Sequence, residues 1–173
     1  MKLYKNFNVS NNHKNSIILI GNFDGVHMGH QKLFKQANNY KKKFNLKIWV
    51  LTFEPMPKMF FNKGFKNFRI SNINQKNIIL ENLGADFIIT KKFDKVFSKT
   101  KSINFIKQIL FQKLNAKFIF VSNNFRFGNK REGDVNLLIN HELDYDYKVI
   151  KPKPLITSNN LLLVIRGLGL ITL

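Results

Sequence analysis

The sequence predicts an α/β protein built on a doubly wound sheet of about five parallel strands. Two observations predict this class. Short apolar runs recur along the chain, and longer segments with helical spacing of apolar residues lie between them. Strands that alternate with helices favour a parallel sheet with right-handed crossovers. A chain of 173 residues suits one domain with a sizeable core, so we expect a single domain over residues 1–173.

The first strand and helix are predicted around residues 16–44. Ile17 to Ile20 form a short apolar run, which is typical of a buried parallel strand. Gly21 and Gly25 then interrupt the pattern, and an amphipathic segment follows. Its apolar positions are Leu33, Phe34, Ala37, Tyr40 and Phe44. The sequence therefore predicts a strand, a glycine-bearing turn and a helix that ends in a run of three lysines, where cations suit the helix dipole.

The remaining elements follow from the same patterns. Further strands are expected at 47–53, 86–90, 117–121 and 146–150, and helices at 72–83, 100–114 and 134–141. Asn72 is a candidate N-cap, and Gly84 a stop signal. Residues 1–15 read as a lead-in strand or loop, with His13 at the surface. Two prolines in residues 54–64 predict a stiff, extended loop there rather than a helix.

Two histidines lie where the first predicted turn becomes a helix. His27 and His30 are three residues apart, so their side chains share one face. The first turn of a helix has free N–H groups and attracts phosphate, and glycine at 25 and 29 allows close approach of a ligand. Two imidazoles there suit a phosphoryl group that gains charge during a reaction. A zinc site is not expected, because there is no cysteine and His13 and His141 match no ligand spacing.

Three polar, glycine- or proline-bearing loops should converge on one edge of the sheet. They follow the first, second and fourth predicted strands, at residues 21–27, 54–64 and 122–133. Ligands of doubly wound sheets bind beyond the carboxyl ends of the strands, where the strand order reverses. The sequence thus predicts a Rossmann-like arrangement with one composite site.

Charge and composition limit the classes of partner. The formal net charge is +19 and the sequence pI is about 10.2, which is compatible with a nucleic-acid or anionic-surface partner. The lysines are scattered through the chain together with many Asn, Ile and Phe, so we expect no specific nucleic-acid partner. The N-terminus has no apolar signal region, and the longest apolar run is too short to cross a bilayer. We therefore expect a cytoplasmic protein without membrane partners.

Three motifs carry a resemblance to one family. GNFDGVHMGHQ at residues 21–31, TFEPMP at 52–57 and NFRFGNKREGD at 124–134 occur in that order. Together they resemble the bacterial FAD synthetases, a branch of the H-x-G-H nucleotidyltransferases. The resemblance implies a fold of nucleotidyltransferase type and transfer of the adenylyl group of ATP to FMN, with Mg²⁺ accompanying ATP. The positive charge would help to gather both anionic substrates.

The same resemblance implies roles for individual residues. His27 and His30 would be catalytic. Nucleotide-binding residues would be Gly21, Asn22, Phe23, Asp24, Gly29, Asn124, Arg126 and Arg166. Flavin-binding residues would be Thr52, Phe53, Pro55, Pro57 and Phe60. Asp24 could orient a histidine or cap the helix, and we favour the cap. Lys130 and Arg131 would add positive charge to the third loop, and no resident metal is expected.

Residues 160–166 depart from the family pattern. Family members carry Ser-Ser-Thr before x-Ile-Arg at another helix start, whereas this chain has leucine at 161–163 before Ile165 and Arg166. Leucine cannot donate a hydrogen bond to phosphate, so ATP binding should be weakened. We expect a C-terminal part that is divergent or truncated from about residue 157, through a truncated or frame-shifted gene or a second half that is encoded elsewhere. We expect no riboflavin kinase domain or activity.

Three alternatives remain open. Another nucleotidyltransferase of the superfamily could act on pantetheine phosphate or a polyol phosphate, although the second and third motifs favour the flavin branch. A non-catalytic flavin or nucleotide binder is a different class, which the leucines at 161–163 favour. A nucleic-acid-binding protein rests on charge alone, and a steep salt dependence would identify it. The sequence leaves the oligomeric state open.

Overall fold

The computed structural model describes residues 1–62, 64, 69–152, 155–157 and 160–162. Within these residues a six-stranded sheet forms the centre, and every neighbouring pair of its strands is parallel. From one edge to the other the strands are β1 (Lys2–Tyr4), β4 (Phe87–Lys92), β3 (Ile48–Glu54), β2 (Ser16–Ile20), β5 (Ala116–Phe120) and β8 (Lys148–Ile150). The order runs outward in both directions from β2 and β5, so the expected doubly wound sheet is confirmed.

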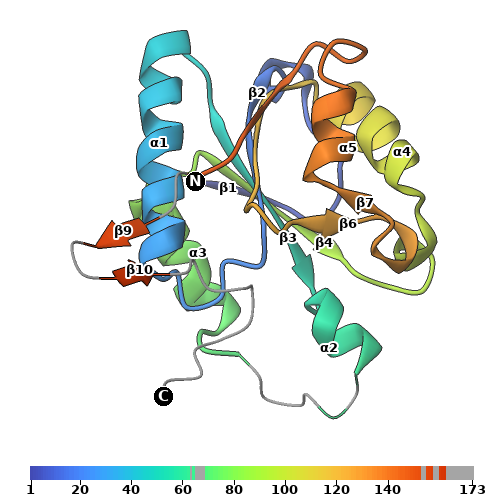
Figure 1. Cartoon of the computed structure of the whole chain (residues 1–173), viewed down its shortest axis with the longest axis horizontal. Helices are drawn as coiled ribbons and strands as arrows, with labels where there is room; N and C mark the ends of the chain where they lie inside the picture. The colour runs from blue at the N-terminus through green and yellow to red at the C-terminus, as the bar shows by residue number, and fades with distance from the viewer. Residues whose placement is uncertain (63, 65–68, 153–154, 158–159, 163–173) are drawn as a thin grey trace.

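Helices cover both faces of the sheet (Figure 1). One face carries α1 (Met28–Phe44) and α3 (Ile73–Asn82), and the other carries α4 (Ser102–Asn104), the π-helical segment η3 (Phe105–Lys113) and α5 (Val135–Asn140). Strand β2 shows why two layers form. Ile17 and Leu19 pack under α1, whereas Ile18 and Ile20 pack on the opposite side against η3. The central strands are buried on both faces, as their continuous apolar sequence predicts.

The sheet has one strand more than the sequence predicted. Residues 2–4 of the lead-in segment pair with β4 and form the edge strand β1. The expectation that His13 lies on the surface is wrong as well. It is the last residue of the short 3₁₀ helix η1 (Asn11–His13), and its ring is half-buried, with its centroid 4.3 Å from that of Phe87. Its Nδ1 lies 2.9 Å from the Tyr4 hydroxyl, so the ring helps to fix β1 against the sheet.

The loop after β3 contains a helix, contrary to the expected extended segment. Helix α2 (Pro57–Phe61) projects beyond the end of β3 (Figure 1). Pro57 is the first helical residue, and at that position a missing N–H costs nothing because the first helical N–H groups have no partner in the helix. Proline therefore starts this helix instead of preventing it.

Helices 72–83 and 100–114 are found close to their predicted positions, with one difference in winding. Asn72 caps α3 with a full capping box to Gln75, which confirms the predicted N-cap. The second helix is wound as π-helix over η3, and Leu114 donates to the Ile109 carbonyl five residues back. Phe105 of this helix lies in the core, whereas Ile103 is exposed.

The loop after β5 contains little regular structure, but short paired strands and a helix cap fix its course. It contains the paired strands β6 (Arg126–Phe127) and β7 (Gly133–Asp134), with the 3₁₀ helix η4 (Asn129–Arg131) between them. Another 3₁₀ helix, η2 (Phe97–Lys99), follows β4. Asp134 caps α5 by accepting a hydrogen bond from Leu137 N.

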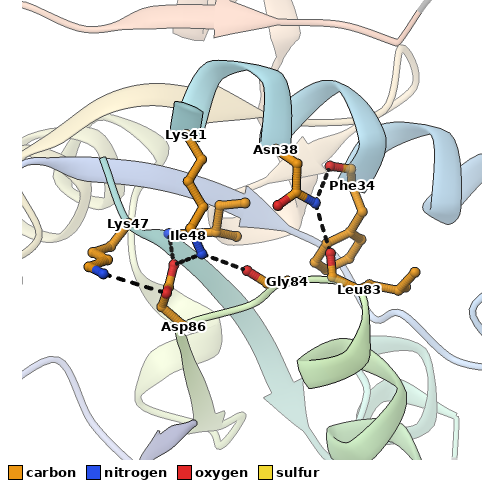
Figure 2. Close-up of polar contacts among 8 residues, drawn as sticks. All are labelled: Phe34, Asn38, Lys41, Lys47, Ile48, Leu83, Gly84 and Asp86. Carbon is orange, nitrogen blue, oxygen red and sulfur yellow. Dashed lines mark hydrogen bonds and ion pairs between the residues drawn. The ribbon is translucent and has the colours of Figure 1, made fainter. Parts of the chain in front are cut away.

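A polar cluster joins α1 to the turn between α3 and β4, at the amino ends of the strands (Figure 2). The carboxylate of Asp86 accepts a hydrogen bond from Ile48 N and lies 2.7 Å from Lys41 Nζ. Asn38 donates to the Leu83 carbonyl, and Gly84 follows with a φ of 102°, where a Cβ would lie 2.6 Å from Asn38 Oδ1. Glycine is therefore required at position 84, and its predicted role as a helix stop is confirmed.

The segment with the three leucines differs from the expected helix start. Residues Asn160–Leu162 form strand β10, which pairs antiparallel with β9 (Leu155–Thr157). Leu163 and Arg166 lie outside the described residues. Within the described part of the chain, no helix has both the length and the apolar character needed to span a membrane.

Candidate nucleotide and flavin site

The three loops that carry the sequence motifs all leave the carboxyl ends of central strands. The turn 21–27 follows β2, the segment with α2 follows β3, and the loop 121–134 follows β5. The strand order reverses between β2 and β5, and this is where doubly wound sheets bind their ligands. The predicted convergence of the motifs on one sheet edge is therefore confirmed.

The turn after β2 combines backbone N–H groups that donate no hydrogen bond within the described part of the chain with apolar side chains that are buried. Phe23, Gly25 and Val26 adopt positive φ values of 51°, 68° and 33°, and the side chains of Phe23 and Val26 are buried. Among the described residues, no acceptor lies within hydrogen-bond distance of the N–H groups of residues 22–25. Consecutive free N–H groups in such a turn form a concave site for an anion.

The two histidines meet at the start of α1, as their spacing predicted. Their ring centroids are 3.8 Å apart and the rings are stacked at 23°. His27 is the N-cap residue, and its Nδ1 accepts a hydrogen bond from Gly29 N at 3.2 Å. His30 packs on the Phe23 ring, with centroids 4.9 Å apart, and its Nδ1 is buried without a partner in the described structure.

Burial keeps both rings neutral near pH 7. His27 is exposed over most of its surface, but the buried part of its ring is enough to lower its pKa. Burial lowers the pKa of His30 to about 3, the neighbouring His27 adds to this shift, and Asp24 partly opposes it. A neutral His27 that accepts at Nδ1 carries its proton on Nε2, so it can donate one hydrogen bond from that atom.

Asp24 does not cap α1, so that expectation is wrong. Its carboxylate accepts hydrogen bonds from Ile70 N, Ser71 N and the Ser71 hydroxyl, at 3.0 to 3.2 Å. These groups belong to the segment just before α3. Asp24 therefore ties the turn after β2 to the start of α3, and His27 takes the cap because it lies one residue before the helix.

Thr52 lies beneath the turn instead of facing a flavin. Its side chain is fully buried, and its hydroxyl donates to the Asn22 carbonyl at 3.3 Å. Lys76 of α3 reaches the same two residues, and sequence analysis did not identify it. One feature of the sequence could have indicated it: Lys76 lies four residues before Leu80, on the helix face that is buried.

Aromatic side chains gather where β3 and β4 end. Phe93 and Phe97 pack against Phe53, and the Phe60 ring lies edge-on to Phe93 with centroids 5.3 Å apart. Phe60 is half-buried, whereas Phe61 is 66% exposed. Pro55 and Pro57 bracket the bend that leads into α2, and the bond between Glu54 and Pro55 is cis. Phe61, Phe93 and Phe97 were not among the predicted site residues.

The third loop contributes exposed polar and basic groups. Asn124 is exposed and accepts a hydrogen bond from the Ser122 hydroxyl. Arg126 lies 3.5 Å from Asp134, and Lys130 and Arg131 are exposed. Arg166 lies outside the described residues. In the described part of the chain, no three His, Cys, Asp or Glu side chains gather as a metal site.

The doubly wound parallel sheet, with a histidine pair at the start of its first long helix, is an α/β fold of nucleotidyltransferase type. Residues 9–162 match the family described as FAD synthetase. The chain belongs to the FAD synthetase family.

Curated relatives agree with this assignment. The chain is 40% identical over 152 residues to the bifunctional riboflavin kinase/FMN adenylyltransferase of Buchnera aphidicola subsp. Acyrthosiphon pisum, covering 88% of this chain and 49% of the relative. It is 35% identical over 133 residues to the protein of that name from Escherichia coli K12, covering 77% of this chain and 42% of the relative. The chain thus spans about half the length of the curated relatives it matches.

A solved structure supports the fold. The crystal structure described as a macrolide-efflux protein from Streptococcus pneumoniae superposes with a TM-score of 0.77 at 25% sequence identity. The match covers 94% of this chain and 52% of that one. The likeness therefore extends over nearly all of the α/β domain.

Proposed function

We propose that this chain transfers the adenylyl group of ATP to FMN and releases FAD and pyrophosphate. The observation that carries the proposal is the stacked pair His27 and His30 at the first turn of α1, beside an anion-binding turn. Membership of the FAD synthetase family supports it, because the matched relatives are named FMN adenylyltransferases.

The reaction is an in-line displacement at phosphorus. A phosphate oxygen of FMN bonds to the α-phosphorus of ATP, the bond from that phosphorus to the bridging oxygen breaks, and pyrophosphate leaves. Such chemistry needs alignment and neutralisation of charge more than covalent help. The N–H groups of residues 22–25 bind phosphate oxygens, and His27 donates from Nε2. The stack on Phe23 and His27 fixes the direction in which the His30 ring points.

The remaining predicted residues have proposed roles around this centre. Gly21 and Gly29 leave space for the nucleotide, and Asn124, Arg126 and Arg166 contact it. The aromatic cluster at the end of β3 is proposed to hold the flavin ring between Phe53, Phe60 and the two prolines. Mg²⁺ is proposed to arrive with ATP and balance its charge. A cytoplasmic location and the absence of a specific nucleic-acid partner stay predictions.

The direct test is formation of FAD from FMN, ATP and Mg²⁺, followed by chromatography. Wild-type protein should form FAD, and His27→Asn and His30→Gln should each lower kcat by about 10² to 10³, as for loss of one preorganised donor. His141→Gln is the matched control, because His141 is a histidine beside Asp144 at the end of α5. Full activity in both site variants would remove the histidine pair from the mechanism.

The open alternatives predict different outcomes in the same assay. Product from pantetheine phosphate or a polyol phosphate, and none from FMN, would favour another nucleotidyltransferase. Binding of ATP and FMN measured by calorimetry, without turnover of either, would favour a non-catalytic binder.

A further inference from the structure

Lys76 is a buried lysine beneath the anion-binding turn. It is 6% exposed, although lysine is among the residues least often buried. Its Nζ lies 3.3 Å from Thr52 Oγ1 and 3.5 Å from the Asn22 carbonyl oxygen. Because the Thr52 hydroxyl also donates to that carbonyl, side chains from β3 and α3 converge on one peptide group of the turn.

That peptide group controls the direction of an N–H group in the turn. The carbonyl of Asn22 and the N–H of Phe23 belong to one planar trans peptide and point in opposite directions. Two donors hold the carbonyl toward Lys76, so they turn the Phe23 N–H to the other side. Phe23 has a φ of 51°, a conformation that non-glycine residues adopt at a cost. The two donors stabilise it.

The charge of Lys76 is not neutralised by a direct ion pair. Asp24 and Arg69 are the charged groups that act on it. Asp24 is occupied by Ile70 and Ser71, and Arg69 pairs with Glu54. None of the ion pairs within the described residues includes Lys76. Burial lowers the pKa of Lys76, Arg69 adds to this shift, and Asp24 partly opposes it. An ammonium group at this position attracts an anion bound over the turn without touching it.

We infer that Lys76 is a positioning residue for ATP: with Thr52, it holds the Asn22 carbonyl inward so that the turn presents its N–H groups to phosphate. The inference rests on the proposed function and deepens it. It predicts that ATP binding depends on Lys76 and the Thr52 hydroxyl, whereas FMN binding does not.

The test compares four variants. Lys76→Met and Thr52→Val remove the two donors, and Thr52→Ser keeps the hydroxyl. Lys41→Met is the control. Lys41 is also a partly buried lysine, but it pairs with Asp86 at the amino ends of the strands, away from the candidate site (Figure 2). Each variant is measured for Tm, for Kd of ATP with Mg²⁺ by calorimetry, and for KM of both substrates.

Lys76→Met should raise the Kd and KM of ATP about tenfold or more and leave the KM of FMN unchanged, because a hydrogen bond and a charge are lost. Its Tm should stay within about 4 °C of wild type, since the Asn22 carbonyl keeps Thr52 as a partner and a buried charge is removed. Thr52→Val should weaken ATP binding, and Thr52→Ser should restore it. Lys41→Met should lower Tm and leave ATP binding intact.

Each result decides the inference. ATP binding like wild type in folded Lys76→Met, or equal loss in Lys41→Met, would overturn it. If Lys76→Met does not fold, unchanged ATP binding in Thr52→Val would overturn it instead. If wild type forms no FAD, the proposed function fails, and calorimetry still tests Lys76. If wild type does not bind ATP either, amide NMR signals of residues 22–25 decide: the inference requires a shift in Lys76→Met and none in Lys41→Met.

Discussion

His27 combines two roles that can be separated by substitution. Its Nδ1 caps α1 through Gly29 N, while its ring stacks on His30 and presents Nε2 to the site. Asparagine is a good N-cap but has no ring. His27→Asn should therefore retain the stability of the fold, whereas His27→Ala should lose about 1 kcal/mol of unfolding free energy.

Both changes at His27 should lower kcat for FAD formation equally, by about 10² to 10³. Urea denaturation and the FAD assay on the same preparations check this pair of expectations. If His27→Asn kept activity, the ring would have no role beyond the cap.

His30 should make the stability of the protein depend on pH. Its pKa is about 3 in the folded chain and near 6.5 when unfolded, so between these values the unfolded state binds more protons. Stability from this group is therefore complete above pH 6.5 and is lost as the pH falls toward 3.

The comparison uses urea unfolding of wild type and His30→Gln at pH 7.5 and 5. The difference in unfolding free energy between them should shift by roughly 2 kcal/mol against wild type at pH 5, from about 1.4 kcal/mol per pH unit below the unfolded pKa. Carboxylates titrate in both proteins and cancel in the difference. A difference that stays constant across this range would contradict the buried, neutral His30.

At the scale of elements, periodicity predicted the buried central strands and the long helices well. It missed elements whose formation depends on neighbours. Strand β1, which the sequence offered only as a lead-in strand or loop within residues 1–15, has three residues and pairs with β4. Helix α2 was missed because two prolines in one segment favour an extended loop, whereas Pro57 occupies the first helical position. The β9–β10 pair replaced an expected helix start that came from resemblance alone.

The site was predictable where a motif is local in sequence and not where contacts are long-range. The approach of His27 and His30 followed from their spacing. The partners of Asp24 lie 46 and 47 positions away, and Lys76 lies 54 positions from Asn22. No local pattern encodes such contacts, so the capping role expected for Asp24 was wrong and Lys76 was overlooked.

The loop after β5 should tolerate no side chain at Gly128. Its φ is 78°, and a Cβ there would lie 2.7 Å from Ser102 N. Gly128→Ala should therefore destabilise the fold by roughly 2–3 kcal/mol, through backbone strain and displacement of the loop from the start of α4.

Asn123→Ala is the matched control, because Asn123 is exposed in the same loop and should change stability by less than about 0.5 kcal/mol. Urea denaturation measures both variants. Equal stability of Gly128→Ala and Asn123→Ala would show that the loop is not docked on Ser102.

Across the whole molecule, the candidate site and the polar cluster around Asp86 lie at opposite ends of the strands. The carboxyl ends carry the histidine pair and the aromatic cluster, and the amino ends carry the Asp86 cluster that fastens α1 to β4. Helix α1 connects the two ends. Its 17 residues span about 25 Å, from His27 beside the site to a last turn with three lysines. Charge in that last turn can therefore reach the site only through the long-range field.

The formal charge of +19 should assist ATP capture only at low salt. The screening length is about 30 Å at 0.01 M salt and about 8 Å at 0.15 M, against the roughly 25 Å length of α1. A Lys42→Glu/Lys43→Glu variant, with Lys42→Gln/Lys43→Gln as the graded control, should raise the KM of ATP up to severalfold at 0.01 M salt. At 0.15 M both variants should match wild type.

The same salt series tests the nucleic-acid hypothesis. Binding of random DNA with a steep salt slope would support a role for the charge in nucleic-acid binding. A KM of ATP that rises in the Glu variant by the same factor at both salt concentrations would contradict the field argument, because screening would have removed a long-range effect. It would mean instead that the last turn of α1 acts on the site through the structure of the helix.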